Sequence, residues 1–124
     1  MTVSEVATTL PIVERSAIDL ARAIREGELT SREVVEAHVE HARAVNPRIK
    51  ALAADRFEAA LADADAADER VREGGELPPL LGVPCTIKES FAVEGMPNAA
   101  GLVSRRDLRA ERDAPAVARL RAAG

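Results

Sequence analysis

Large aromatic side chains are scarce in this sequence: it has two Phe and neither Tyr nor Trp, although 47% of its 124 residues are hydrophobic. Alanine supplies much of that apolar share, so any core has to be built from small aliphatic side chains. The single cysteine, Cys85, excludes an internal disulfide, and two histidines without a third ligand beside them argue against a zinc site. We therefore expect no metal and no cofactor in a chain that has the length of one domain.

The charge pattern and the apolar runs exclude further classes. The chain has 17 Lys plus Arg and 21 Asp plus Glu, a formal net charge of -4, and the two signs are interspersed. Without a basic stripe, a nucleic-acid partner is not expected. No apolar run approaches the roughly 20 residues of a membrane span, and the N-terminus does not resemble a signal peptide. We therefore expect a soluble, cytoplasmic protein with no membrane partner.

The first helix is predicted after an irregular arm. Residues 1–15 show no clear period. Ser16 followed by Asp19 is a helix-start signal, and Gly27 is a stop signal. An amphipathic helix is therefore predicted between them, with a stripe of apolar residues at helical spacing: Ala17, Leu20, Ala21 and Ile24.

A second helix is predicted to follow at once. Thr30 with Glu33 forms a capping box, and the helix is expected to end before Asn46-Pro47. Its buried stripe is marked by Val35, Val39 and Ala42. The two helices are predicted to pack as a hairpin.

The rest of the chain mixes predicted strands and helices. Residues 49–54 are apolar and follow a turn signal, which predicts a short strand, with helix as the alternative. A helical stripe begins at Phe57 and stops at the glycines 74–75. Residues 80–87 are apolar and partly β-branched, which predicts a buried strand. Asp113 is expected to cap a last helix with three side chains inward: Ala114, Val117 and Leu120.

This order of elements predicts a layered α/β fold with residues 80–87 as its main strand. The last predicted helix would normally lead into another strand, and none follows it in the sequence. The main strand would then keep an unpaired edge. On these grounds the chain is expected to be truncated.

One lysine stands at the end of the main predicted strand. Lys88 follows the apolar run 80–87 and precedes a turn rich in Gly and Pro. In open α/β sheets, ligands bind beyond the carboxyl ends of strands. This position makes Lys88 a candidate functional residue, and the alternative is a lysine that only reaches to solvent from the strand end.

The residues around Lys88 form an ordered motif: Gly82-Val83-Pro84, Thr86-Ile87-Lys88, Phe91, Val93, Gly95, Met96-Pro97 and Gly101. This motif resembles the first catalytic segment of the amidase signature family. The end of the chain, residues 113–124, resembles the helix that comes next in that family. With the earlier helices included, the resemblance covers residues 16–124.

The resemblance implies an α/β fold, the N-terminal part of the amidase-signature fold, with helices packed on a mixed sheet of which only the first strands are present. Residues 16–124 would form a partial amidase domain that ends before the family's Gly/Ser-rich segment. It also implies hydrolysis of an amide by a Ser, cis-Ser and Lys triad, in which Lys88 matches the lysine. A lysine base must be neutral, and an ordinary lysine is neutral only about once in 2,500 molecules at pH 7, so the site has to be desolvated.

The sequence departs from the family pattern at several positions. Residues 98–99 are Asn-Ala where the family often has two threonines, and Leu102 replaces a frequent serine. Glu89 stands where Asp is more usual. Ser90 lies two residues after Lys88 and could share its face in an extended backbone, but a Ser/Lys dyad there would lack an oxyanion hole and a third group.

Other ionisable residues have a simpler interpretation. His38 and His41 share a helical face with acidic residues, which favours a solvated surface over a ligand pair. Cys85 is interpreted as a small core residue of the apolar strand rather than as a nucleophile. The acidic residues of the third helix are interpreted as its solvent face: Asp63, Asp65 and Asp68.

Two functions follow from the sequence. The first is catalytic: an amidase of small-molecule carboxamides that uses Lys88, of which this chain alone, without the two serines, is expected to be inactive. The second is a small interaction or complementing module derived from an amidase, which docks onto a partner that supplies the missing strands.

Overall fold

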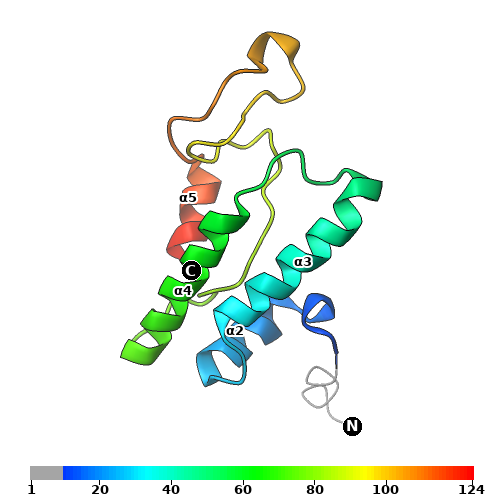
Figure 1. Ribbon diagram of the computed structural model, residues 1–124. Helices are drawn as coiled ribbons and strands as arrows, with labels where there is room; N and C mark the ends of the chain where they lie inside the picture. Colours follow the sequence, from blue (N-terminus) through cyan, green and yellow to red (C-terminus); the bar gives the residue numbers. More distant parts are fainter. Residues whose placement is uncertain (1–9) are drawn as a thin grey trace.

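The computed structural model describes residues 10–124. These residues form helices and contain no β-strand, so the predicted strands at 49–54 and 80–87 are absent from this part of the chain (Figure 1). The α/β architecture expected from the sequence is therefore not seen in the described residues. The elements are the short 3-10 helices η1 (Ile12–Glu14) and η2 (Val103–Arg105) and the α-helices α2 (Ala17–Glu26), α3 (Ser31–Ile49), α4 (Phe57–Glu73) and α5 (Pro115–Ala122).

Helix α2 begins and ends where its sequence signals predict. The Ser16 side chain accepts a hydrogen bond from the Asp19 N–H at 3.2 Å, and Gly27 ends the helix in the left-handed conformation with a φ of 74°. Glycine adopts this conformation without the steric cost that other residues meet. The buried face of α2 consists of Leu20, Ala21, Ala23 and Ile24.

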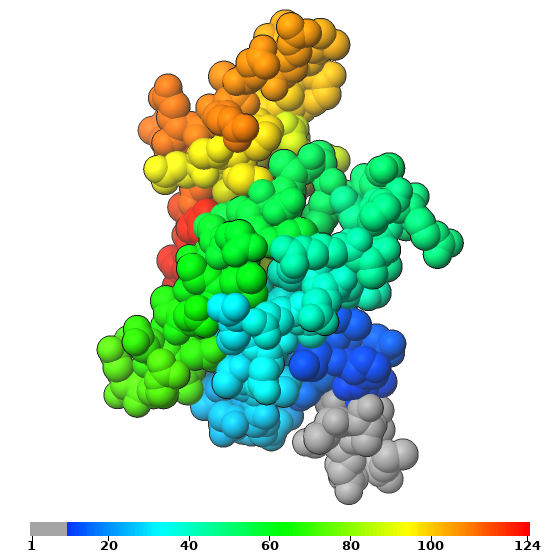
Figure 2. Space-filling model, viewed as in Figure 1, coloured from blue at the N-terminus to red at the C-terminus, as the bar shows by residue number. Residues whose placement is uncertain are grey.

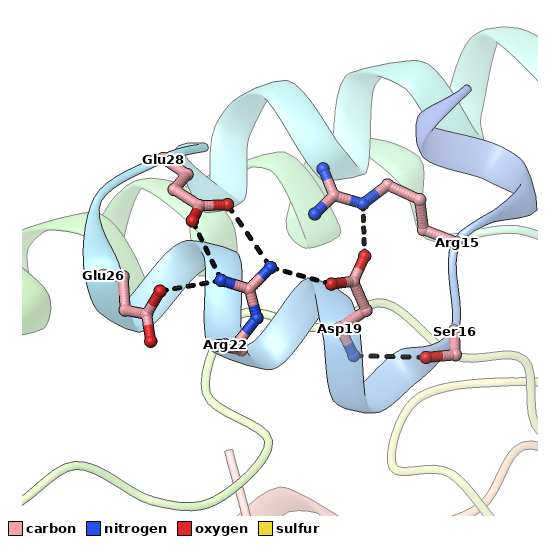
Figure 3. A network of polar contacts seen from close by, with 6 residues as sticks. All are labelled: Arg15, Ser16, Asp19, Arg22, Glu26 and Glu28. Atoms are coloured by element: carbon pink, nitrogen blue, oxygen red, sulfur yellow. Dashed lines mark hydrogen bonds and ion pairs between the residues drawn. The ribbon is translucent and has the colours of Figure 1, made fainter. Parts of the chain in front are cut away.

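A network of ion pairs fixes α2 to the segments before and after it (Figure 3). The Asp19 carboxylate, in a side chain only 11% exposed, accepts from Arg15 Nε and from Arg22 Nη2, the latter at 2.9 Å. The hydrogen bond from Arg15 is the main cause that lowers the pKa of Asp19. Arg22 also contacts Glu26 at 2.7 Å and Glu28 at 2.9 Å, and these bonds raise its pKa. The network thus joins the start of α2 to the turn that leads into α3.

Helix α3 has two caps at its N-terminus, of which the sequence predicts one. The predicted capping box is present: Thr30 Oγ1 accepts from the Glu33 N–H at 3.1 Å, and the Glu33 carboxylate accepts from the Thr30 N–H at 2.7 Å. The second cap comes from α4, where Asp68 accepts from the N–H groups of Ser31 at 2.7 Å and Arg32 at 3.0 Å. The interpretation of Asp68 as a solvent-facing residue is therefore wrong.

Helix α3 continues past its predicted end. It runs through Asn46 and Pro47 to Ile49, although Pro47 has no N–H to donate to the carbonyl four residues before it. Lys50, with a φ of 53°, then donates its N–H to the Asn46 carbonyl at 2.8 Å. The Asn46 side chain binds both the N–H and the carbonyl of Leu52, so the chain turns where a strand was expected.

Helices α3 and α4 form an antiparallel pair, and the core lies along their contact (Figure 1). One buried cluster consists of Val35, Val39 and Ala64, with Phe57, Ala60 and Leu61 against it. A second joins α2 to α3 through Leu20, Ile24 and Val34, with Ile12, Leu29, Val71 and Val83 against it. Both clusters consist almost entirely of aliphatic side chains, as the composition predicts.

The segment that leads to Lys88 is fastened at two points. The Leu80 N–H donates to the Ala123 carbonyl at 2.8 Å, and Ser31 Oγ donates to the Gly82 carbonyl at 2.8 Å. Residues 79–82 form a turn, and residues 83–88 form neither helix, turn nor ladder. The predicted strand fails here because a strand needs a neighbouring strand, and residues 10–124 supply none.

Helix α5 is capped differently from the prediction. Its N-cap is Ala114, without a side-chain cap, and Pro115 takes the first helical position. Asp113 lies one residue too early to cap the helix and binds elsewhere. Val117 is buried as predicted, whereas Leu120 is 43% exposed, contrary to the prediction.

Candidate functional site

Lys88 lies at the junction between the helical body and a projecting loop. In the space-filling view, the yellow to orange atoms of residues around 90–112 form a lobe beyond the helices (Figure 2). Lys88 itself is exposed, and its carbonyl accepts from the Phe91 N–H at 2.9 Å. Among the ion pairs of residues 10–124, none includes Lys88.

The projecting loop is closed by its own backbone. The Gly95 N–H donates to the Ala110 carbonyl at 2.8 Å, and the Ala110 N–H donates to the Met96 carbonyl at 3.0 Å. The Asn98 N–H donates to the Leu108 carbonyl at 3.1 Å. These bonds pair residues 95–98 with residues 108–110 in a short antiparallel arrangement. The loop therefore has a defined path beside Lys88.

Glu89, the residue after Lys88, binds the tip of this loop. Its carboxylate accepts hydrogen bonds from the N–H groups of Ala99 and Ala100, the second at 2.8 Å. Its main-chain carbonyl accepts from Asn98 Nδ2 at 2.9 Å. The tip itself is tightly curved, because Ala100 and Gly101 have φ angles of 50° and 76°.

Asp113 fastens the other end of the loop to α5. Its carboxylate accepts from the Glu94 N–H at 2.8 Å and from Arg121 Nε. These contacts lower the pKa of Asp113, the bond from Glu94 most and the bond from Arg121 next. The native state thus holds the ionised form of Asp113, and the loop and the helix share one carboxylate.

We predict that this contact makes stability depend on pH. A carboxylate with a lowered native pKa stabilises the fold fully above its ordinary pKa of about 3.9, and this contribution is lost as the pH falls toward the native pKa. Asp113→Asn should therefore lower the melting temperature at pH 7, and its difference from the parent should shrink between about pH 5 and pH 3. Thermal unfolding followed by circular dichroism measures both.

Asp107→Asn is the matched control, because the Asp107 side chain is 92% exposed and contacts only the adjacent Arg106. This variant should follow the parent at every pH. A difference between Asp113→Asn and the parent that stays constant from pH 7 to pH 3 would contradict the prediction.

The other candidates from the sequence lie apart from Lys88 or do not bind it. Ser90 is exposed, and no hydrogen bond joins its side chain to Lys88 within the described residues. Cys85 is exposed, so its interpretation as a core residue is wrong: residues 83–88 lack the strand neighbours that would bury it. His38 Nδ1 lies 2.7 Å from the Val34 carbonyl, and His41 is exposed.

No group of three or more potential metal ligands occurs in the described part of the chain. Likewise, none of its helices has the length and apolarity needed to cross a bilayer. Asp63 and Asp65 are exposed and contact Arg56 and Arg32, as a solvent face predicts.

Sequence reasoning missed Ser31 as a structural residue. The local sequence predicts only a helix start at Thr30, whereas Ser31 is fully buried and joins α3 to Gly82 and Asp68. Its two partners lie 37 and 51 residues farther along the chain. No local pattern reveals contacts at such a separation.

The structure thus places an exposed lysine, Lys88, directly before a loop that is bound by the carboxylate of Glu89. The sequence model of the Amidase family matches residues 33–124, which include Lys88, Glu89 and the whole loop. The chain therefore belongs to the amidase family, as its motif around Lys88 indicates.

Curated relatives share this part of their sequence with the chain. Fatty-acid amide hydrolase 2-A of Danio rerio is 50% identical over 94% of the chain, and indoleacetamide hydrolase of Bradyrhizobium diazoefficiens is 47% identical over 92%. A glutamyl-tRNA(Gln) amidotransferase subunit of Alkalilimnicola ehrlichii is 40% identical over 90%. The chain spans 22 to 23% of the length of these relatives.

A solved structure has a similar fold over most of the chain. It is described as part of a vestigial protein complex that reveals the evolutionary origins of an s-triazine catabolic enzyme. It matches 88% of the chain and 24% of its own length, with a TM-score of 0.83 and 36% sequence identity. The described fold is thus the arrangement found in one part of a larger protein of known structure.

Proposed function

We propose that the whole protein hydrolyses the C–N bond of a carboxamide and that Lys88 is the base of a Ser, cis-Ser and Lys triad. The observation that supports this proposal is the family match over residues 33–124, a range that includes Lys88. Lys88 alone of the three triad residues is assigned to this chain.

In the proposed reaction, one serine attacks the amide carbonyl and its proton passes through the bridging serine to the amine of Lys88. The tetrahedral intermediate then expels ammonia or an amine, which takes up this proton, and leaves an acyl-enzyme. Water attacks the acyl-enzyme by the same route and releases the carboxylic acid. No electrons are gained or lost, so the reaction needs no redox partner.

Lys88 is exposed within residues 10–124, so the desolvation that keeps a lysine base neutral has to come from the rest of the whole protein. A nearby carboxylate would favour the charged form of a lysine and so reduce the share of the neutral form that a base needs. The adjacent Glu89 carboxylate is bound to two backbone N–H groups, and none of the ion pairs of residues 10–124 reaches Lys88. Within residues 10–124, the carboxylate next to Lys88 in the sequence is therefore bound to the loop and is not paired with the lysine.

The names of the relatives guide the choice of substrate. Two of the relatives with high identity are named for amides with a large apolar group, a fatty-acid amide and indoleacetamide. We infer that the substrate is an uncharged carboxamide with an apolar acyl group. Glutamine is the alternative, because the name of the 40% identical amidotransferase subunit refers to it.

We also infer an α/β fold for the whole protein, in which residues 83–88 pair with other strands. No backbone hydrogen bond within residues 10–124 involves the N–H groups of Cys85, Thr86 or Ile87. Backbone groups left without partners are costly to bury, so a sheet neighbour would satisfy them.

The test is ammonia release by the purified whole protein from matched carboxamides. We expect turnover of indole-3-acetamide and a fatty-acid primary amide at a kcat/KM at least roughly tenfold above that of glutamine, the size of a modest apolar contribution to specificity. Turnover of none of the amides would contradict the proposed activity, and a preference for glutamine would contradict the substrate class.

A further inference from the structure

We propose that Glu89 is a positioning residue for the amidase site, which holds the loop tip at residues 98–101 in place next to Lys88. This inference rests on the proposed function, because it gives Lys88 the role of base. The inference is based on the hydrogen bonds that Glu89 accepts from Asn98, Ala99 and Ala100.

The first argument is the conformation of the loop tip. Ala100 has a φ of 50° and is followed by Gly101 at 76°. The left-handed conformation is sterically unfavourable for a residue with a side chain, so contacts elsewhere must hold Ala100 in it. Consecutive N–H groups in such a tip point to one side and form a concave site for an anion. The Glu89 carboxylate occupies that site by accepting from Ala99 and Ala100.

The second argument is that this contact has no substitute nearby. None of the ion pairs of residues 10–124 includes Glu89, so its charge is met by backbone N–H groups rather than by a cation. The backbone pairing of residues 95–98 with 108–110 closes the loop, but it does not connect the loop to Lys88. Among the hydrogen bonds of residues 10–124, those that join the loop tip to Glu89 run from Asn98 Nδ2 to its carbonyl and from the N–H groups of Ala99 and Ala100 to its carboxylate.

The third argument concerns charge. A carboxylate in the position next to Lys88 could pair with its ammonium group and hold it protonated. Instead, both carboxylate oxygens of Glu89 accept hydrogen bonds from the loop tip. Glu89 thereby holds the loop tip in place and does not form an ion pair with Lys88.

The test compares Glu89→Gln, which keeps the shape but loses the charge and one acceptor, with Glu89→Asp, which keeps the carboxylate. In the chain, amide hydrogen exchange by ¹H–¹⁵N NMR should accelerate roughly tenfold or more at Ala99 and Ala100 in Glu89→Gln, because bonds to charged acceptors are among the stronger ones. In the whole protein, kcat should fall roughly tenfold to a hundredfold with KM within about twofold, since a small misplacement of a site costs this much.

Glu89→Asp should recover most of both properties, and Glu94→Gln is the matched control. Glu94 is exposed in the same loop, and the hydrogen bond of that residue uses its backbone N–H. Protected amides in α3 show that each variant is folded. Unchanged exchange at Ala99 and Ala100 in Glu89→Gln would overturn the inference, and so would faster exchange with unchanged kcat. The exchange result does not depend on activity, so a failure of the proposed amidase function is recognised separately.

Discussion

Replacement of Lys88 by alanine in the whole protein is expected to lower kcat for carboxamide hydrolysis by roughly 100-fold to 10,000-fold, the range that a general base contributes. The attacking serine would then have no group to take its proton. KM should change little, because the amine of Lys88 acts on the serines rather than on the substrate. Ammonia release under saturating substrate measures the loss.

Arginine separates the role as a base from the role of positive charge. Lys88→Arg keeps the charge, but a guanidinium does not lose its proton in proteins, so this variant should be as impaired as Lys88→Ala. The control is Lys50→Arg, which changes the other lysine of the sequence at an exposed position. Activity of Lys88→Arg close to that of the parent would rule out the assignment of Lys88 as the base.

Gly82→Ala should lower the free energy of unfolding by about 2–5 kcal/mol. This estimate adds the cost of a left-handed backbone at alanine to the cost of overpacking a buried site. Gly82 has a φ of 78°. A Cβ there would lie 2.6 Å from Ser31 Oγ and 2.7 Å from Ser31 Cβ. Ser31 is fully buried and held by Asp68, so it cannot move aside. Chemical denaturation followed by circular dichroism measures the change.

Gly95→Ala is the matched control for this variant. Gly95 has the same φ of 78°, but a Cβ there would meet no atom within 4 Å. It should therefore show only the backbone cost of about 1–2 kcal/mol, and the difference between the two variants measures the contact with Ser31. Equal losses in the two variants would show that the approach of Ser31 to Gly82 does not matter to stability.

The features that the sequence predicts well are those whose partners lie within a few residues. Ser16 with Asp19 and Thr30 with Glu33 form the expected caps, because each pair lies three residues apart on one helical turn. Gly27 ends α2 for an equally local reason. Small aliphatic residues at helical spacing likewise give the buried faces, since the period alone decides which side chains face the core.

The failed predictions depend on distant contacts. The end of α3 is an exception: Asn46 and Pro47 look like a stop signal, but the helix continues to Ile49 and the Asn46 side chain binds Leu52, six residues farther on. Asp68 caps α3 from another helix, and Asp113 binds the loop before α5 instead of capping it. The sequence of residues 80–87 has the apolar character of a strand, but a strand also needs a neighbour, which no local pattern supplies.

The role of Lys88 remains a prediction. The motif indicates Lys88 as the functional residue, and the family match includes it. The sequence also marks Glu89 as a departure from a more usual Asp. It does not reveal that this carboxylate binds the N–H groups of Ala99 and Ala100, because that contact depends on the path of the loop between them.

The bond between Leu80 and Ala123 has a consequence for the order of folding during synthesis. The helices α2, α3 and α4 and both core clusters need no residue beyond Val83, so they can pack while the rest of the chain is still being made. The Leu80 anchor forms only after Ala123 has left the ribosome. Within residues 10–124, we therefore expect the segment that carries Lys88 to settle after the helical body has packed.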